Sequence, residues 1–210
     1  MEPTVVWRRP AKRGATTPLV VLLHGRGADE HDLIGLADEL PRAFAYASLR
    51  APYEFPGGFG GYCWFEDRGP GRPVPESLQS TVDLLRAWLD GPATAEYDRA
   101  RTFVLGFSQG MMTAGALILA DPQRFAGAVL LSGAFALDTG SATPDRLAGL
   151  PVFTGHGTFD SVIPPERVVQ TMEYLRGRSG AALTERTYPI DHSISRSEIA
   201  DINAWLEERG

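Results

Sequence analysis

Residues 102–110 read TFVLGFSQG, and this stretch decides the expected fold. Its first six residues form an apolar run of strand type, and a second apolar run from Met111 to Ala120 has the length of a buried helix. Between the two runs, residues 106–110 match the pattern G-x-S-x-G. This pattern exposes a reactive serine where it joins a strand to a helix, and the flanking runs supply both elements. We therefore predict that Ser108 is a nucleophile on a sharp strand-to-helix turn.

The residues around Ser108 suit such a turn. Gly106 and Gly110 leave room where neighbouring elements approach closely. The turn holds Ser108 in a strained backbone conformation that projects the hydroxyl away from the chain. The helix that begins near Gln109 offers free N–H groups and the positive end of its dipole to a developing oxyanion. We predict the backbone N–H of Gln109 as one donor of an oxyanion hole.

Apolar runs of strand type alternate with segments of helical spacing along the chain. This alternation predicts a mostly parallel central sheet with helices on both faces, an α/β architecture that forms a single domain over residues 1–210. Val5 to Arg8 could add an antiparallel edge strand. The other expected strands are 19–23, 44–49, 102–107, 128–131, 151–155 and 183–188. Three expected helices are 32–40, 76–89 and 111–120. A fourth is opened by Pro164 and Pro165, with Val168, Val169, Met172 and Leu175 on its inner face, and a fifth carries Ile199, Ile202, Trp205 and Leu206.

A serine nucleophile needs a base, and the chain has four histidines. In this kind of fold the nucleophile comes first along the chain, the acid second and the histidine last. His24 and His31 precede the serine, so we expect His24 to shape the loop after its strand and His31 to lie at the surface or at a helix start. We predict His192 as the base. We expect His156 to be buried and to brace the loop that follows it.

Two aspartates compete for the acid that orients the base. Asp160 lies in the loop after the strand 151–155, and His192 follows the strand 183–188. Parallel strands bring such loops to one edge of the sheet, where α/β folds place their sites. Asp191 is adjacent to His192, but neighbouring side chains of an extended segment point to opposite sides. We therefore prefer Asp160 as the acid and keep Asp191 as its rival.

The second oxyanion donor is expected in the loop after an earlier strand. Residues 24–27 read HGRG and follow the strand 19–23. The glycines of this loop permit the backbone to turn an N–H toward a substrate. We predict Arg26 as the donor, through its backbone N–H rather than its side chain. An ordinary turn is the alternative.

The segment from Ala51 to Pro75 is longer than most loops of compact domains. It is the only large insertion that could wall a substrate site in a chain too short for a cap domain, and its aromatic content argues against disorder. We predict that Tyr62 and Trp64 form this wall and that Met111 lies near the substrate. The alternatives are a satellite core beneath the loop and, for Met111, packing inside its helix. The aromatic residues are Tyr53, Phe55, Phe59, Tyr62, Trp64 and Phe65.

The composition and net charge limit which binding partners and which cellular location we expect. The chain has 210 residues and a formal net charge of -6, which disfavours nucleic acid or an anionic membrane surface as the main partner. Its single cysteine, Cys63, excludes an internal disulfide. We expect no leader sequence, and residues 111–120 are too few to cross a membrane. We expect a cytoplasmic protein without stable membrane insertion, present as a monomer or homodimer.

Four blocks of the sequence resemble the phospholipase/carboxylesterase family, which includes acyl-protein thioesterases and small bacterial carboxylesterases. They are residues 23–27 (LHGRG), residues 106–110 (GFSQG), residues 156–160 (HGTFD) with Pro164, and the pair Asp191 and His192. The resemblance spans roughly residues 19–206 and implies a minimal α/β-hydrolase fold without a large cap domain. It also implies site residues, namely nucleophile Ser108, acid Asp160, base His192 and oxyanion donors at Arg26 and Gln109.

The chain departs from this family at two positions. Asp191 stands where the family usually has glycine before its histidine, and Arg26 stands where a small or apolar residue is common. Arg26 suggests a polar or anionic group near the entrance, or a solvated side chain. Neither departure removes a member of the expected triad.

The predicted activity is hydrolysis of small to medium acyl esters through an acyl-enzyme, with a small-molecule ester as substrate and with no metal or organic cofactor. Acyl thioesterase and lysophospholipase activities are alternatives at the same site. A non-catalytic binding protein is a remote alternative, because such proteins typically lose a member of the triad. Nucleotide binding lacks support, since neither a G-x-G-x-x-G nor a G-x-x-x-x-G-K-[ST] pattern occurs.

Overall fold

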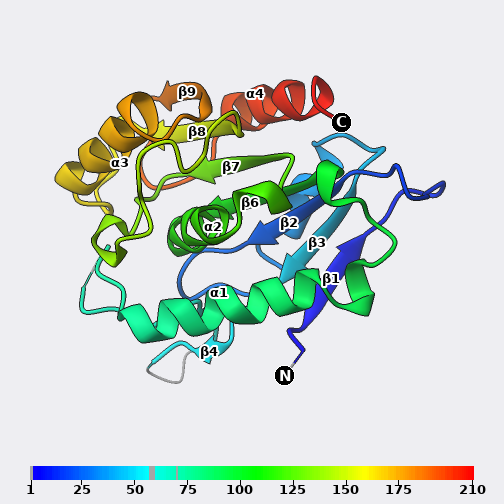
Figure 1. Cartoon of the computed structure of the whole chain (residues 1–210), viewed down its shortest axis with the longest axis horizontal. Helices are drawn as coiled ribbons and strands as arrows, with labels where there is room; N and C mark the ends of the chain where they lie inside the picture. Colours follow the sequence, from blue (N-terminus) through cyan, green and yellow to red (C-terminus); the bar gives the residue numbers. More distant parts are fainter. Residues whose placement is uncertain (1, 57–59, 70) are drawn as a thin grey trace.

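A seven-stranded sheet forms the centre of the molecule (Figure 1). The computed structural model describes residues 2–56, 60–69 and 71–210. The strand order is β1-β3-β2-β6-β7-β8-β9, and β4 pairs with β5 in a separate hairpin. The strands are β1 (Val5–Arg8), β2 (Leu19–Leu23), β3 (Ala45–Leu49), β4 (Tyr53–Glu54), β5 (Tyr62–Cys63), β6 (Thr102–Phe107), β7 (Gly127–Leu131), β8 (Pro151–Gly157) and β9 (Ala182–Tyr188). The helices are α1 (Pro75–Leu89), α2 (Gln109–Ala120), α3 (Pro165–Gly177) and α4 (Arg196–Glu207), with short 3-10 turns η1 (Ile34–Asp38), η2 (Pro92–Thr94), η3 (Arg99–Arg101), η4 (Pro122–Arg124) and η5 (Leu137–Thr139).

The sheet is parallel except at one edge. β1 pairs antiparallel with β3, and every other neighbouring pair of the large sheet is parallel. The structure therefore confirms the predicted mostly parallel sheet with an antiparallel edge strand. Because the parallel strands share one direction, the loops that follow β2, β6, β8 and β9 meet at the same edge of the sheet. This edge collects the sequence blocks around Ser108, Asp160 and His192.

Helices cover both faces of the sheet, as predicted. The core on one face contains Leu85 of α1, Leu117 of α2 and Tyr174 of α3, and Figure 1 shows α1 and α2 side by side there. The core on the other face contains Ala37 of η1 and Trp205 of α4. Within the described residues, no helix is long and apolar enough to cross a membrane.

One sequence-based expectation for helices is wrong and another is wrong in part. The segment 32–40 forms a short 3-10 helix, η1, rather than an α-helix. On α3 the structure confirms that Leu175 is buried and that Met172 packs against the core, whereas Val169 is 54% exposed. Thr171 and Tyr174 complete the inner face. Thr171 Oγ1 accepts a hydrogen bond from the backbone N–H of Phe135, a contact that an apolar pattern does not indicate.

The long segment from Ala51 to Pro75 adds a small hairpin instead of a cap domain. Tyr62 in β5 accepts a hydrogen bond from the N–H of Gly27, and its own N–H donates to Ala28. The approach is so close that a Cβ on Gly61 would lie 2.0 Å from the carbonyl oxygen of Gly27. The hairpin thus fixes the loop after β2. Phe59, which the sequence analysis grouped with the aromatic residues of this segment, lies outside the described residues.

A buried carboxyl group lies under the start of α4. Glu198 is fully buried, and its Oε2 accepts the N–H of Ser195 while its backbone N–H donates to Ser195 Oγ. This reciprocal pair is a capping box that starts the helix. Glu198 Oε1 has no hydrogen-bond partner in the described part of the chain. It lies so close to Gly155 that a Cβ there would be 2.1 Å away. Burial of the carboxyl raises the pKa of Glu198 to about 7.

We expect Glu198→Gln to remove a pH dependence of stability. The folded state keeps the Glu198 proton up to a pKa of about 7, whereas the ordinary value is 4.5, so the folded state binds more protons between these limits. The free energy of unfolding therefore falls as the pH rises through this window, by about 3 kcal/mol for this group. Urea unfolding at pH 5 and pH 8 measures the effect.

Glu198→Gln should be more stable than the wild type at pH 8 and nearly equal to it at pH 5. Glu207→Gln, an exposed substitution in the same helix, is the matched control and should track the wild type at both values. An equal shift of Glu198→Gln at both pH values would contradict the assignment of a protonated buried carboxyl.

Candidate active site

Ser108 lies in a strained turn between β6 and α2. Its backbone has φ 57 and ψ −117, a positive φ that residues with a side chain rarely adopt. Both glycines of the pattern are required by close backbone contacts. A Cβ on Gly106 would lie 2.3 Å from the carbonyl oxygen of Gly110, and a Cβ on Gly110 would lie 2.0 Å from that of Leu23. The turn therefore fits only where both flanking residues lack a side chain.

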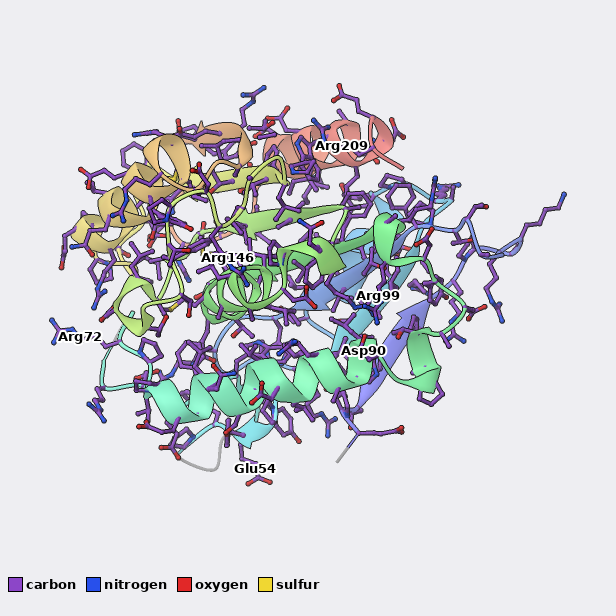
Figure 2. All side chains as sticks on the ribbon, in the orientation of Figure 1. Glu54, Arg72, Asp90, Arg99, Arg146 and Arg209 are labelled. Carbon is purple, nitrogen blue, oxygen red and sulfur yellow. The ribbon has the colours of Figure 1, made fainter. Side chains whose placement is uncertain are left out.

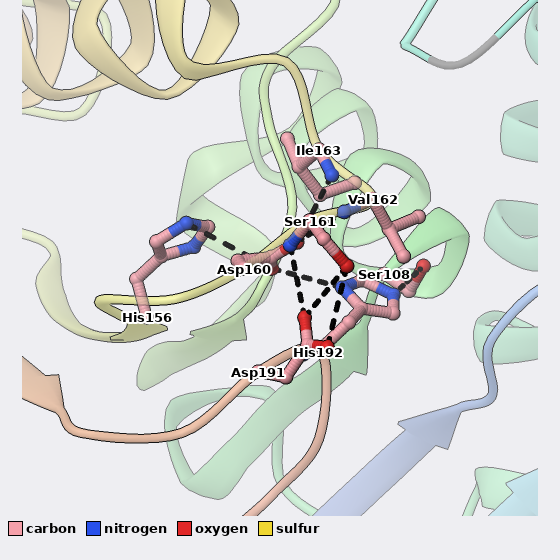
Figure 3. A network of polar contacts seen from close by, with 8 residues as sticks. All are labelled: Ser108, His156, Asp160, Ser161, Val162, Ile163, Asp191 and His192. Atoms are coloured by element: carbon pink, nitrogen blue, oxygen red, sulfur yellow. Dashed lines mark hydrogen bonds and ion pairs between the residues drawn. The ribbon is translucent and has the colours of Figure 1, made fainter.

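His192 joins Ser108 to Asp160 in a continuous hydrogen-bonded array (Figure 3). His192 Nε2 lies 2.8 Å from Ser108 Oγ, and His192 Nδ1 lies 2.9 Å from Asp160 Oδ2. Because a carboxylate oxygen accepts, Nδ1 carries the proton and Nε2 is left to accept from the serine hydroxyl. The three residues follow β6, β8 and β9.

Asp160 is held as a carboxylate. Its side chain is only 1% exposed, and its Oδ1 accepts the N–H groups of Val162 at 2.9 Å and Ile163 at 3.0 Å. Burial alone would raise the pKa of Asp160. The hydrogen bonds from His192 and from the two N–H groups outweigh burial, so this pKa lies below its ordinary value. The carboxylate is thus fixed in place and charged next to the imidazole.

Asp191, the rival acid, bonds to backbone and serine groups rather than to the imidazole ring. Its Oδ1 accepts the N–H of Ser161 at 2.9 Å and the N–H of His192 at 2.8 Å, and Ser161 Oγ donates to it as well. These hydrogen bonds lower the pKa of Asp191. Asp191 therefore ties the loop that carries Asp160 to the loop that carries His192 (Figure 3).

The other three histidines, His24, His31 and His156, lie in different surroundings from one another. His156 Nε2 lies 3.8 Å from Asp160 Oδ2, and burial lowers the pKa of His156. His24 is fully buried, donates from Nδ1 to the carbonyl of Gly25 and accepts the N–H of Ala51 at Nε2. It thereby shapes the loop after β2. The side chain of His31 is 68% exposed.

Two residues that line the Ser108 cleft have backbone N–H groups without an internal acceptor among the described residues. Among the described residues, neither the N–H of Arg26 nor that of Gln109 forms a hydrogen bond. Gln109 is the first residue of α2, where helical N–H groups have no partner within the helix. Both residues line the cleft that contains Ser108. The arrangement can therefore hold an oxyanion between the two loops.

The side chain of Gln109 has a role that the sequence analysis missed. Its Oε1 accepts the N–H of Trp64 at 2.8 Å, and its Nε2 donates to the carbonyl of Phe65 at 3.0 Å. Gln109 thus fastens the aromatic segment to the turn that carries Ser108. An amide next to the nucleophile, able to donate and accept at once, was the available signal.

The predicted wall of the cleft is wrong. The cleft beside Ser108 holds about 270 Å³, and its apolar lining is Phe65, Met112, Val162 and Ile163. Trp64 is fully buried, and its indole N–H donates to the carbonyl of His24. The ring of Tyr62 lies 4.5 Å beneath the guanidinium of Arg50, and Met111 is buried within the core against Gly133. These three side chains pack beneath or beside the cleft instead of lining it.

We expect Trp64→Ala to destabilise the protein without changing its substrate preference. Loss of a fully buried indole costs about 3–5 kcal/mol, which lowers the Tm by about 10 °C or more in a chain of this size. Val162→Ala is the reciprocal control, because Val162 is 47% exposed and lines the cleft. It should shift the preference for acyl length and barely change the Tm. A changed preference in Trp64→Ala with an unchanged Tm would contradict the burial of this residue.

Comparison with known proteins places the chain among esterases. Residues 9–209 match the profile described as phospholipase/carboxylesterase. The chain belongs to the phospholipase/carboxylesterase family. The candidate hydrolase MhqD of Bacillus subtilis is 28% identical over 94% of this chain and 96% of its own length. Acyl-protein thioesterase 1 of Candida albicans is 27% identical over 95% of both chains. The crystal structure of esterase PE8 superposes with a TM-score of 0.82 at 26% identity and covers 100% of both chains.

Membership of the phospholipase/carboxylesterase family agrees with the architecture. The chain has the α/β-hydrolase fold, and its described residues form no large cap domain. It is an enzyme of the carboxylesterase or thioesterase type.

Proposed function

We propose that the protein is a serine carboxylesterase that hydrolyses small to medium acyl esters through an acyl-enzyme. One observation carries the proposal: His192 lies within hydrogen-bond distance of both Ser108 Oγ and Asp160 Oδ2. A serine activated by an adjacent imidazole, itself oriented by a buried carboxylate, is the arrangement that acyl transfer requires. Family membership supports the reaction class.

The array suggests the following steps. Ser108 Oγ attacks the carbonyl carbon of the ester while its proton passes to His192 Nε2. The tetrahedral intermediate collapses, the bond to the leaving oxygen breaks, and His192 returns the proton to the departing alcohol. Water then attacks the acyl-enzyme with His192 again as base, and the carboxylic acid leaves. Asp160 keeps the imidazole in the correct tautomer and stabilises the imidazolium in both halves.

The backbone N–H groups of Arg26 and Gln109 are the proposed oxyanion donors. Each lines the cleft and lacks an internal acceptor among the described residues, so each is free to bind the charged oxygen of the intermediate. Hydrogen-bond donors fixed in advance stabilise a charge that develops only in the transition state. The positive end of the α2 dipole adds to the same effect.

The size and lining of the cleft support a small to medium acyl group. A volume of about 270 Å³ with one aromatic, one thioether and two branched aliphatic side chains fits a short apolar chain. Acyl thioesterase and lysophospholipase activities remain candidates because a thiol or a larger alcohol can leave from the same intermediate. The relatedness to acyl-protein thioesterase 1 of Candida albicans favours the thioester among these.

Hydrolysis of a series of 4-nitrophenyl esters from acetate to palmitate tests the proposed function. We expect the highest kcat/KM at short or medium length and a decline at palmitate. A parallel assay with octanoyl-coenzyme A measures the thioesterase alternative. Absence of turnover on every ester and on the thioester would reject the enzymatic proposal and favour a binding protein.

A further inference from the structure

A second cleft opens next to the Ser108 cleft. It holds about 510 Å³ and lies between the loop that precedes α1 and the start of α3. Val162 and Ile163 line both clefts, so the two hollows adjoin at these side chains. We refer to the two adjoining clefts together as the trough. A substrate held at Ser108 lies next to the second cleft.

The second cleft is lined by three arginines, Arg68, Arg72 and Arg167. Arg68 and Arg72 are exposed, and no carboxylate of the described residues lies within 4.0 Å of either guanidinium. Figure 2 shows Arg72 projecting outward from the body of the molecule, in the loop next to α3. These two side chains are therefore available to bind a further group.

The carboxylates in and beside the second cleft are shared unevenly among the arginines. Arg167 pairs with Asp138 at 3.1 Å, and Glu166 also lines the cleft. Asp160 lines the cleft as well and is held by His192. These three carboxylates equal the three guanidinium groups in number, but Arg68 and Arg72 form no ion pair with any of them. A guanidinium group without a carboxylate partner can bind an anionic ligand.

The two walls of the trough meet at Gly71. A Cβ on Gly71 would lie 3.6 Å from Cγ of Arg167, so the aliphatic stem of Arg167 packs beside the loop that carries Arg68 and Arg72. On the Ser108 side of the same loop, Asp67 binds the side chain of Arg26 at 3.0 Å. Arg26 is thereby paired, whereas the two arginines without an ion pair among the described residues lie at the far end of the trough.

We propose that the trough selects esters that carry an anionic group, a carboxylate or a phosphate, away from the scissile carbonyl, and that Arg68 and Arg72 bind this group. The planar guanidinium suits both anions because it can donate two parallel hydrogen bonds. This inference rests on the proposed function of Ser108. It names the class of substrate for that site.

Matched ester pairs test the inference. Mono-(4-nitrophenyl) glutarate and 4-nitrophenyl pentanoate differ in a carboxylate on the acyl side, whereas 4-acetoxyphenyl phosphate and phenyl acetate differ in a phosphate on the leaving group. The readout is the ratio of kcat/KM for the anionic ester to that for its neutral counterpart. In Arg68→Gln/Arg72→Gln we expect this ratio to fall about tenfold for at least one pair, as loss of two exposed ionic contacts allows. Arg68→Lys/Arg72→Lys should recover part of it.

Arg42→Gln is the matched control, because Arg42 is also exposed but lies between η1 and β3, away from the trough. It should leave both ratios unchanged. A ratio that stays within about twofold of the wild type for both pairs in Arg68→Gln/Arg72→Gln would overturn the inference, whereas Ser108-dependent turnover of the neutral esters would leave the proposed function intact.

A binding measurement tests the anion site independently of the proposed esterase activity. The Ser108→Ala variant keeps the arginines and should bind mono-phenyl glutarate without turnover, with a Kd that rises about tenfold when Arg68→Gln/Arg72→Gln is added. An unchanged Kd rejects the anion site even where turnover by the wild type supports the esterase.

Discussion

Ser108→Ala is expected to lower kcat for ester hydrolysis by about 10⁴- to 10⁶-fold. The substitution removes the atom that bonds to the acyl group, and only binding and the oxyanion donors remain to assist water. The fold should be unaffected, because alanine meets the same positive φ as serine at this position and its Cβ is already accommodated. Steady-state rates with 4-nitrophenyl acetate and the Tm by calorimetry measure both effects.

Ser132→Ala is the matched control for this variant. Ser132 is also a serine at positive φ, directly after the neighbouring strand β7, and it is buried. Its Oγ has no hydrogen-bond partner among the residues that the structure describes. We expect Ser132→Ala to keep the wild-type rate within about threefold, an effect typical of an uninvolved side chain. Retention of more than about a tenth of the rate by Ser108→Ala would contradict the assignment of the nucleophile.

Asp160→Asn is expected to lower kcat by about 10⁴-fold, as loss of the orienting carboxylate does in serine hydrolases with this array. The amide cannot stabilise an imidazolium, and it can donate to Nδ1, which would move the proton to Nε2 and leave no acceptor for the serine hydroxyl. The N–H groups of Val162 and Ile163 can still bond to the amide oxygen, so the loop should keep its shape.

Asp191→Asn tests whether Asp191 orients the imidazole of His192 through its charge or only supports the backbone of the two loops. Asp191 bonds to the N–H groups of Ser161 and His192 and not to the imidazole, so its loss should cost no more than about tenfold. Both variants remove one negative charge from the same two loops, which makes them a matched pair. If Asp191→Asn lost about 10⁴-fold and Asp160→Asn stayed near the wild type, the acid would be Asp191.

The fold and the meeting of Ser108, Asp160 and His192 could be anticipated from sequence for a definite reason. Each of the three follows a strand of a parallel sheet, and parallel strands direct their following loops to one edge. The alternation of strand and helix patterns was therefore enough to place these residues at one edge of the sheet. Their contact also depends on the strand order, in which β6, β7, β8 and β9 are successive neighbours.

The lining of the cleft could not be predicted in the same way. Between Tyr62 and Phe65 every residue is aromatic or apolar, so no alternation shows which side chains face the cleft. In α2 almost every position is buried, and a helix without a polar face gives no indication that Met112 lines the cleft while Met111 packs in the core. Only the side-chain packing of the folded protein shows which of two neighbouring residues lines the cleft.

The arginine cluster illustrates a second limit. Arg68 and Arg72 belong to the loop before α1, whereas Arg167 lies nearly a hundred residues later in α3. In the sequence of a chain with net charge -6, scattered arginines are interpreted as solvent-exposed surface residues. Only the contact between Gly71 and Arg167 brings them to one cleft beside Ser108.

Active-site labelling tests the central claim most directly. A fluorophosphonate reacts with a serine only when a neighbouring base activates it, and the phosphorus adopts the tetrahedral geometry that the oxyanion donors bind. We predict one equivalent of label on the wild-type protein, located by peptide mass spectrometry at Ser108, and no label on His192→Ala under the same conditions. Label on another residue, or ester hydrolysis that persists in protein fully labelled at Ser108, would contradict the proposed mechanism.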